Sequence, residues 1–542
     1  MRQQARELIY LTNDKKNVKG QLKIIVFLML IATFFISVKA ETSKSLELFS
    51  YTELTELYEN EQLSPMLDAK LKNLLTHPVV NNSFQNNSPL QLTNSERYGE
   101  FLRVVHWNIE RGLEFDAIGA VFESEEKLLA LLNEKTFPPG SEKRRELLDQ
   151  AALLRRADVI VLNEVDLGMK RTDYRDVAAE LAAKLGMNYA FGVEFVELSP
   201  IQIKKDVKAE DNGQKEVLDL IEVDPVRYKG IQGTAILSRF PLENVRLMPF
   251  ENQPYDWYKS EKKGASFLEK GKREISKRIF LEKIIPEIRR GGRTSLIAEI
   301  ADPRFPSGRV TIAATHLENR TKPANRQKQL KELLKKIKDI SHPVILAGDM
   351  NTSTSDLTPT SFRRELTKRF GSPKFWIKQG IGMLLGFGML EDFALEAVTF
   401  GRKHADPTVK SIPIISPNPE RKFFSTLENF RFADGGAFDF RGDPTRSSRE
   451  KAEKLSGSNE RGRMGFVTTY QVKRPIGFIG KYKLDWIFVK PAKLTDPADL
   501  NQSYLFAPHF GRTLTAINEL VEDRISDHRP IMVDLPLTEP KL

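Results

Sequence analysis

The sequence predicts an α/β or mixed α+β fold built around buried sheets. Several short segments between residues 101 and 535 are apolar at nearly every position, as expected of strands that are buried on both faces. Helical patterns alternate with these segments, and such alternation is typical of sheets covered by helices. With 542 residues, 40% hydrophobic and 29% charged, the chain can bury a large core.

Charge and cysteine content narrow the classes of function. The formal net charge is +10 and the pI is near 9.3, which favours anionic partners such as nucleic acid, phosphate esters or an acidic membrane surface. Cysteine is absent. Disulfides, thiolate zinc sites and a cysteine nucleophile are therefore excluded, whereas the redox compartment stays open.

Residues 1–40 are interpreted as an export signal, which would make the protein periplasmic or extracellular. Several lysines precede an uncharged apolar run at 24–38, and the following SVKAE offers a cleavage site after Ala40. The run is shorter than the roughly 20 residues of a bilayer span. An uncleaved membrane anchor through 24–38 is the second interpretation, because the stretch ahead of the run is unusually long, and a buried core helix is the third.

Residues 41–96 are predicted to form a helical segment and a linker. Leu54, Leu57 and Tyr58 recur at helical spacing, and Ser64 followed by Pro65 is a suitable cap and first turn for a second helix. The Asn- and Ser-rich stretch at 81–95 marks a loop. We place the start of the main domain, residues 97–540, after this loop.

The main domain contains eight predicted strands and two long insertions. The predicted strands, in chain order, are 101–109, 157–165, 233–239, 294–301, 309–317, 343–351, 483–489 and 529–535. Insertions are expected at about 197–293 and 356–471. The first is rich in Lys and Arg over 259–293, and the second holds an apolar piece at 376–390 and a basic, mobile piece at 441–463.

Polar residues collect where the predicted strands end. The set comprises Asn108, Glu110, Glu164, His316, Asp349, Asn351, Asp485, Asp527 and His528. Side chains two residues apart lie on the same face of a strand, so Asn108 pairs with Glu110, and Asp349 with Asn351, provided that the extended geometry continues. Strand ends of α/β sheets commonly bind ligands, and we therefore expect one site here.

The chemistry of this set indicates metal-assisted hydrolysis of a phosphoester. Carboxylates and amides without thiols suit Mg²⁺, with Mn²⁺ or Ca²⁺ as alternatives, rather than a structural zinc. Histidines and amides can hydrogen-bond phosphate oxygens, and an aspartate can take a proton from water. A histidine paired with an aspartate can hold its charge against developing negative charge.

Seven short motifs that contain these residues or adjoin them, taken in chain order, resemble those of the endonuclease/exonuclease/phosphatase superfamily. The motifs are WNIE, LNEVD, GTAILSRFP, ATHLENR, GDMN, LDWIFV and SDHRP, and the resemblance covers about residues 101–537 without the insertions. Members include deoxyribonucleases, abasic-site endonucleases, neutral sphingomyelinases, inositol-phosphate phosphatases and deadenylases. The resemblance implies a four-layer sandwich, with two sheets face to face, helices outside and the strand ends lining one cleft.

The resemblance also implies which residues hold the metal. Glu164 would be the principal Mg²⁺ ligand, and Asn108 would lie close to the metal and the phosphate. Asp527 would sit near the metal or near a second ion. Glu110 matches a position that is acidic in some members and is a supporting residue only.

The catalytic roles follow from the same resemblance. Asp349 would orient or deprotonate the attacking water, while Asn351 and His316 would hold phosphate oxygens. Asp485 would orient His528, which contacts the phosphate. The long intervals beside the cleft exceed what a compact member needs, and insertions of this kind usually shape substrate choice.

Ordinary structural roles compete with these assignments. Asp349 and Asn351 could form only an Asx turn, which we would favour if GDMN stood alone. His106 is interpreted as structural and Trp107 as core. The Lys and Arg residues of 259–293 are interpreted as a solvated helix face, with a nucleic-acid groove as the alternative.

Three functions remain open. The first is an exported, Mg²⁺-dependent phosphodiesterase acting on nucleic acid, which the positive charge favours. The second is the same chemistry on a phospholipid or small phosphate ester, in which case the apolar piece at 376–390 would contact lipid instead of packing under a loop. The third is a non-catalytic binding module, which the full set of polar residues argues against. A calcineurin-type metallophosphatase lacks support because GDMN is not followed by histidine-rich motifs. No protein partner can be inferred.

Overall fold

The computed structural model describes most of one compact unit, Ser45–Leu542. The described residues are 47–84, 90–198, 223–262, 287–352, 420–446, 461–462, 465–476, 479–522 and 524–541. The apolar run at 24–38 and the apolar piece at 376–390 lie outside them. Among the helices in these ranges, none is both long enough and apolar enough to cross a membrane.

The larger sheet contains nine strands in the described part of the chain. Its order is β1-β5-β6-β4-β3-β18-β17, with β2 added to β3 and β8 added to β5. Only β3 and β4 run parallel in the pairs of this sheet. The strands are β1 (Val79–Asn81), β2 (Thr93–Ser95), β3 (Gly99–Arg111), β4 (Val159–Leu167), β5 (Asn188–Glu197), β6 (Ile231–Ser238), β8 (Arg289–Gly291), β17 (His509–Thr513) and β18 (Ile531–Pro536).

The smaller sheet has five strands in the order β16-β11-β10-β9-β7, again within the described ranges. The pair β10 and β11 is parallel, and the other pairs are antiparallel. These strands are β7 (Glu243–Pro249), β9 (Thr294–Ala301), β10 (Arg309–His316), β11 (Val344–Asp349) and β16 (Asp485–Lys490). Two short hairpin pairs accompany them, β12 (Arg461–Gly462) with β13 (Gly465–Phe466) and β14 (Tyr470–Ile476) with β15 (Ile479–Tyr482).

The two sheets pack face to face through a buried apolar layer. Val104 and Val161 of the larger sheet share this layer with Ile312 and Ile345 of the smaller sheet. The next residue along β3, Val105, belongs instead to the layer beneath the helices. This alternation follows from the two-residue period of a strand and explains why residues 101–109 of β3 are all buried.

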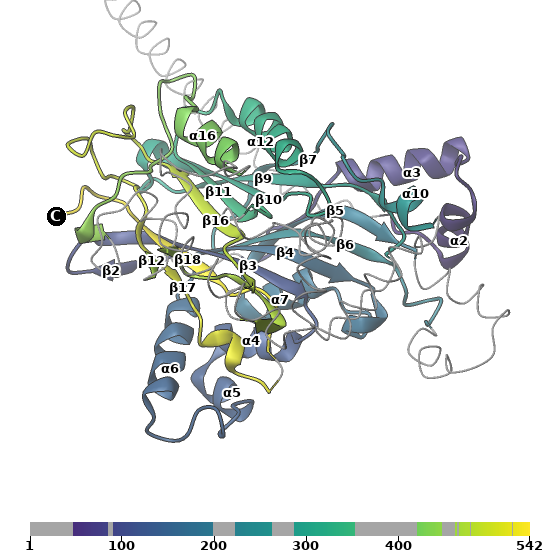
Figure 1. Ribbon diagram of the computed structural model, residues 1–542, viewed down its shortest axis with the longest axis horizontal. Helices are drawn as coiled ribbons and strands as arrows, with labels where there is room; N and C mark the ends of the chain where they lie inside the picture. The colour runs from purple at the N-terminus through teal and green to yellow at the C-terminus, as the bar shows by residue number, and fades with distance from the viewer. Residues whose placement is uncertain are drawn as a thin grey trace, which may run out of the picture. The chain divides into compact units, whose positions relative to one another are not determined.

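Helices cover the outer face of each sheet (Figure 1). The outer face of the larger sheet packs against α4 (Phe115–Glu123), α5 (Glu125–Ala130), α6 (Glu142–Leu154) and α7 (Val177–Leu185), and that of the smaller sheet against α12 (Pro323–Ile337) and α16 (Arg421–Asn429). The helices α2 (Tyr51–Glu59) and α3 (Pro65–Thr76) lie at the right of Figure 1, where α3 contacts both β5 and β7. Shorter helices are α10 (Trp257–Lys262), η1 (Lys170–Thr172), η2 (Pro306–Gly308), η3 (Pro444–Arg446) and η4 (Ile517–Glu519). The predicted fold class, two packed sheets flanked by helices, is confirmed.

The predicted cap of the second N-terminal helix is present, and the first helix has a cap that was not predicted. The Ser64 side chain accepts a hydrogen bond from the Leu67 backbone, and Pro65 is the first residue of α3. Ser50 and Glu53 form a reciprocal capping box at the start of α2. The segment also supplies strands, because β1 pairs with β5 and β2 pairs with β3. Residues 47–84 and 90–96 are therefore part of the same compact unit as the strands that follow.

The interval 197–293 is not one insertion, which corrects the sequence-based expectation. It contains β6, which lies between β4 and β5, as well as β7 and β8. Segments 199–222 and 263–286, which include most of the basic stretch, lie outside the described residues. The expectation failed because the predicted strand 233–239, which corresponds to β6, and the strands β7 and β8 all lie within this interval.

The described part of the interval 356–471 is also integrated into the fold. Phe423 and Phe424 of α16 pack on the outer face of the smaller sheet. The basic piece at 441–463 begins with buried residues: Arg441 and Arg446 both form salt bridges to Asp439. The start of this piece is therefore fixed rather than mobile, because two buried guanidinium groups need their carboxylate partner.

Candidate active site

The strand ends bring the predicted residues together from both sheets. In the smaller sheet, His316 of β10 is in register with Asp349 of β11, which is in turn in register with Asp485 of β16. In the larger sheet, Asn108 of β3 is in register with Asn163 of β4. The parallel strands β3 and β4 end on one side of the larger sheet, and the parallel strands β10 and β11 end on one side of the smaller sheet. The site forms where these two groups of strand ends face each other.

Two strands end in Asx-type turns that shape this edge. The Asn108 Oδ1 accepts a hydrogen bond of 3.1 Å from the Glu110 backbone, and the Asp349 Oδ1 accepts one of 2.8 Å from the Asn351 backbone. Glu110 and Asn351 have φ angles of 46° and 47°, in the left-handed region. The extended geometry therefore stops before each second residue, and the same-face argument does not apply to either pair.

Asp349 lies at the centre of the site and is 2% exposed. Its Oδ2 is 3.3 Å from the Asn108 Nδ2, 3.5 Å from the His316 Nε2 and 3.7 Å from the His528 Nε2. Burial raises the pKa of Asp349 to about 7, although the charge of His528 opposes this shift. A carboxylate with this pKa is suited to exchange a proton near neutral pH.

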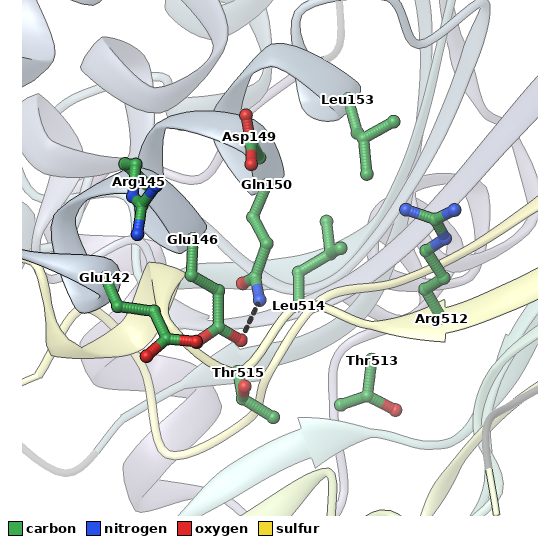
Figure 2. A pocket seen from close by; sticks show the side chains of 10 residues that line it. All are labelled: Glu142, Arg145, Glu146, Asp149, Gln150, Leu153, Arg512, Thr513, Leu514 and Thr515. Atoms are coloured by element: carbon green, nitrogen blue, oxygen red, sulfur yellow. Dashed lines mark hydrogen bonds between the residues drawn. The ribbon is translucent and has the colours of Figure 1, made fainter. Parts of the chain in front are cut away.

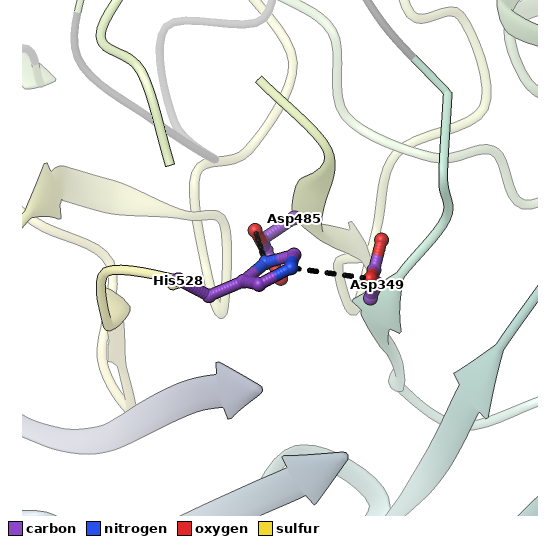
Figure 3. Close-up of side chains that lie close together, drawn as sticks. All are labelled: Asp349, Asp485 and His528. Atoms are coloured by element: carbon purple, nitrogen blue, oxygen red, sulfur yellow. Dashed lines mark hydrogen bonds and ion pairs between the residues drawn. The ribbon is translucent and has the colours of Figure 1, made fainter. Parts of the chain in front are cut away.

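Asp485 and His528 form the predicted hydrogen bond. The His528 Nδ1 lies 2.7 Å from the Asp485 Oδ2, and the His528 ring lies between the Asp485 and Asp349 carboxylates (Figure 3). Burial alone would lower the pKa of His528, but the charges of Asp485 and Asp349 raise it well above its usual value. The same contacts hold the pKa of Asp485 below its usual value despite burial. The pair is therefore ionised.

Three carboxylates collect beside this pair. The Glu110 Oε2 accepts a hydrogen bond of 2.8 Å from the Asp527 backbone, and the Asn108 Nδ2 lies 3.2 Å from the Glu164 Oε1. Burial raises the pKa of Glu110 to about 7, and the charges of Asp527 and Glu164 add to that shift. Such mutual repulsion among oxygen ligands fits a site for a divalent cation.

Among the described residues, one group of acidic and histidine side chains has the spacing of metal ligands. One atom each of Asp349, Asp485 and His528 lies within 4.8 Å of the others. Because the His528 ring donates to Asp485 and keeps its proton, it is better suited to bind an anion than a cation. Glu110, Glu164 and Asp527 offer oxygens only, so these three residues could hold a divalent cation.

His316 and Asn351 line the site in different ways. Both ring nitrogens of His316 are buried and have no hydrogen-bond partner among the described residues. Burial lowers the pKa of His316 well below its usual value, and the charge of Arg293 adds to this effect. The His316 ring is therefore neutral and able to hydrogen-bond a ligand. The Asn351 Nδ2 donates to the Leu317 carbonyl at 2.9 Å.

Several contributing residues were not predicted from the sequence. The Asn163 Oδ1 accepts a hydrogen bond of 2.8 Å from the Asp349 backbone, and the Ser526 Oγ donates to the Asn108 carbonyl at 2.7 Å. His106, interpreted as structural, has its Nε2 3.0 Å from the Asp485 Oδ1. The only signal for Asn163 and His106 is a polar residue inside a mainly apolar segment. Trp107 is buried in the core, as expected.

Lys483 is a further buried cation close to the site. It is 3% exposed, and its Nζ contacts the backbone carbonyl of Asp485. Burial lowers the pKa of Lys483 to about 7, whereas the charges of Asp485 and Asp349 oppose that shift. The position two residues before Asp485 carried no recognisable motif.

The described cations of the stretch 259–293 have protein partners. Lys259 pairs with Glu61, and Lys262 donates to the Tyr58 carbonyl at 2.6 Å. Arg289 and Arg293 are buried, and the Arg293 Nη1 donates to Glu194 at 2.9 Å. These residues do not form a free basic groove, and residues 263–286 lie outside the described part.

A separate polar pocket of about 550 Å³ lies between α6 and the strand β17 (Figure 2). The predicted site residues do not line it. Its Gln150 donates to Glu146 at 2.9 Å and accepts a hydrogen bond of 2.9 Å from the Ala516 backbone. Because its central polar groups satisfy one another, we assign no ligand to this pocket.

A comparison with known protein families agrees with the motifs. The model of the Endonuclease/Exonuclease/phosphatase family matches residues 105–528. No curated protein matches the sequence. Similar solved structures include an endonuclease/exonuclease/phosphatase from Beutenbergia cavernae (17% identity, 80% of this chain and 71% of that chain covered, TM-score 0.35). A second is the human Nocturnin catalytic domain (15% identity, 80% of this chain and 92% of that chain covered, TM-score 0.33). A third is an AP endonuclease from Archaeoglobus fulgidus (13% identity, 80% of this chain and 99% of that chain covered, TM-score 0.31).

Proposed function

Because the chain belongs to the endonuclease/exonuclease/phosphatase family, we propose that it is a divalent-metal-dependent phosphodiester hydrolase. The observation that carries this proposal is the arrangement of two groups around one carboxylate. An ionised Asp485–His528 pair directs the His528 Nε2 toward Asp349, which has a pKa raised by burial to about 7. A non-catalytic module would gain nothing from keeping three buried titratable groups in contact.

The side chains have complementary roles in hydrolysis. Asp349 accepts the proton of the attacking water, for which its raised pKa suits it. The His528 imidazolium, the neutral His316 ring and the Asn108 amide hydrogen-bond the phosphate oxygens and stabilise the negative charge that develops on them. Asp485 keeps His528 charged and fixes its ring.

A divalent cation would complete this chemistry. Glu164, Asp527 and Glu110 would hold it, with Asn108 close by. When bound, the cation would polarise the phosphoryl group and stabilise the leaving oxygen. We propose Mg²⁺, with Mn²⁺ or Ca²⁺ as alternatives, because the donor set consists of oxygens.

Nucleic acid is the substrate class that we favour. The support is the net charge of +10, which attracts a polyanion. The alternative, a phospholipid or small phosphate ester, rests on the apolar runs at 24–38 and 376–390. For the location, we propose export, or anchoring through residues 24–38, because the N-terminal pattern is that of a signal segment.

One experiment separates these proposals. The full-length protein is assayed with Mg²⁺ and with a chelator against DNA, RNA, sphingomyelin and inositol phosphates. We expect metal-dependent cleavage of a nucleic acid. Cleavage of sphingomyelin alone would select the lipid alternative, and no cleavage of any phosphoester would contradict the proposed function.

The metal assignment is tested with Glu164→Gln. This change removes one negative charge and keeps the shape, so the Mg²⁺ concentration for half-maximal activity should rise about tenfold or more. Glu126→Gln, on the exposed face of α5, serves as the matched control and should change nothing. An unchanged Mg²⁺ titration for Glu164→Gln would remove Glu164 from the metal site.

A further inference from the structure

His106 is a second histidine bound to Asp485. It lies on β3 of the larger sheet and is completely buried, whereas Asp485 lies on β16 of the smaller sheet. The His106 Nε2 is 3.0 Å from the Asp485 Oδ1, and the His106 Nδ1 is 3.2 Å from the Val161 carbonyl. A carboxylate oxygen can only accept, so the Nε2 carries the proton of this hydrogen bond.

The two oxygens of Asp485 are therefore bound by two different rings. The Oδ2 accepts from the His528 Nδ1 at 2.7 Å, and the Oδ1 accepts from His106. The torsion that rotates a carboxylate is soft, because it joins an sp³ carbon to an sp² carbon. With only one partner, the Asp485 carboxylate could rotate and carry the His528 ring with it. The second hydrogen bond removes this freedom.

The next residue of β3 supports the same catalytic group from the opposite face. The Trp107 Nε1 donates to the His528 carbonyl at 3.0 Å, and the Trp107 side chain packs in the core beneath the helices. Side chains of adjacent strand residues point to opposite faces. His106 therefore acts on the His528 ring through Asp485, while Trp107 fixes the backbone that carries the ring.

We propose that His106 is a positioning residue of the active site, which holds the Asp485 carboxylate so that His528 presents its Nε2 to Asp349 and to the substrate phosphate. This inference rests on the proposed function for its effect on turnover. It goes beyond that function by assigning a role to a residue with no motif of its own. Its structural part, the control of the His528 ring by His106, can be measured without turnover.

The first test is a double-mutant cycle in the full-length protein, with bis(4-nitrophenyl) phosphate and Mg²⁺ as the assay. His106→Leu should lower kcat about 10- to 100-fold and change KM far less, because it disturbs a group that acts in the transition state. His106→Gln should restore most of the loss, since its side-chain amide can still donate to Asp485. In a His528→Ala background, His106→Leu should have almost no further effect.

A merely structural role gives a different pattern. His106→Leu would then reduce activity by the same factor with and without His528, and His106→Gln would not restore it. Either result would overturn the proposal. The control is His342→Gln: His342 lies half-buried just before β11, with its Nε2 2.7 Å from the Oγ1 of Thr311 near the start of β10, and its substitution should leave kcat unchanged.

The second test is independent of activity. The chain has seven histidines, so the ring N–H signals of a histidine-labelled sample can be assigned one at a time by substitution. In His106→Leu, the signal of His106 should disappear and that of His528 should shift. In His106→Gln, where a weaker donor replaces the imidazole, the His528 signal should shift less, and in His342→Gln it should stay in place. A His528 signal that moves neither in His106→Leu nor in His106→Gln would overturn the proposal even in an active enzyme. A shifted signal in a protein without phosphodiesterase activity would contradict the proposed function and leave the His106–Asp485–His528 contact intact. Should His106→Leu fail to fold, the His106→Gln spectrum decides.

Discussion

Asp349 shows that an ordinary turn residue can also be a site residue. Its Oδ1 accepts the backbone hydrogen bond of an Asx turn, while its Oδ2 faces Asn108, His316 and His528. The two interpretations of GDMN that compete in the sequence are therefore compatible, because a carboxylate has two oxygens. Asn108 divides its amide in the same way, with its oxygen in the turn and its nitrogen in the site.

The Asp485–His528 pair should behave as one unit in kinetics. Once His528 is removed, Asp485 has no ring to orient, so His528→Ala combined with Asp485→Asn should be little worse than His528→Ala alone. Each single change should reduce kcat about 100-fold or more. Losses that multiply in the double variant would mean that the two residues act separately.

The pH dependence should follow Asp349. Its carboxyl group is protonated below pH 7 and cannot then accept a proton, so kcat/KM should fall about tenfold per pH unit below the pKa, which burial raises to about 7. His528 keeps its proton through neutral pH, because its pKa is raised well above the usual value. Adding more Mg²⁺ should move this fall in kcat/KM to lower pH, since a nearby positive charge favours the ionised form of Asp349. A rate that stays constant through and below pH 7 at low Mg²⁺ would exclude Asp349 as the base.

At the scale of single elements, the close approach of two strands explains the glycine of GDMN, Gly348. Gly348 is in register with Thr315 across the parallel pair β10 and β11, and a Cβ at this position would collide with the Thr315 carbonyl oxygen. The glycine therefore lets the two strands approach closely where they deliver His316 and Asp349.

Gly348→Ala should consequently destabilise the protein and reduce activity together. We expect a loss of roughly 1–3 kcal/mol in the free energy of unfolding, because the two backbones must separate. Gly119→Ala is the control: Gly119 lies inside α4, where a Cβ would meet only flexible side chains, and alanine favours a helix. The free energies of unfolding of both variants and of the unchanged protein are measured by chemical denaturation. If Gly348→Ala is as stable as the unchanged protein, the strand ends tolerate the extra atom.

The strands that could be predicted are those in which apolar residues predominate. The segment 294–301, in which five of eight residues are apolar, matches β9 at both ends. β5 was not predicted, since Gly192 and Glu194 interrupt its pattern, yet Glu194 is buried against Arg293. β7 was missed because it is a partly exposed edge strand. Patterns of hydrophobicity cannot show that a distant charge will neutralise a buried one.

At the scale of the whole molecule, the site could be located from sequence but not completed. The motif residues collect at strand ends, which the sequence indicates because polar residues terminate apolar runs. The supporting residues His106 and Asn163 lie within strands, and each acts on a strand of the other sheet. His106 and Asp485 are 379 residues apart in the chain. Only the packing of two sheets against each other brings such residues into contact.

The segment 47–84 should prove essential for folding, although it precedes the motifs. Leucines of α2 and α3, including Leu54, Leu57 and Leu71, are buried in the core of the larger sheet, and β1 hydrogen-bonds to β5. Each buried leucine contributes about 1.5–3 kcal/mol, and a domain is stable by only about 5–15 kcal/mol. Deletion of residues 1–44 should leave the melting temperature unchanged, because the compact unit begins at Ser45. Deletion of residues 1–84 should abolish cooperative unfolding and protease resistance. If the shorter protein melts cooperatively within a few degrees of the longer one, the segment is instead a separate unit, and the domain begins near residue 97 as the sequence pattern indicates.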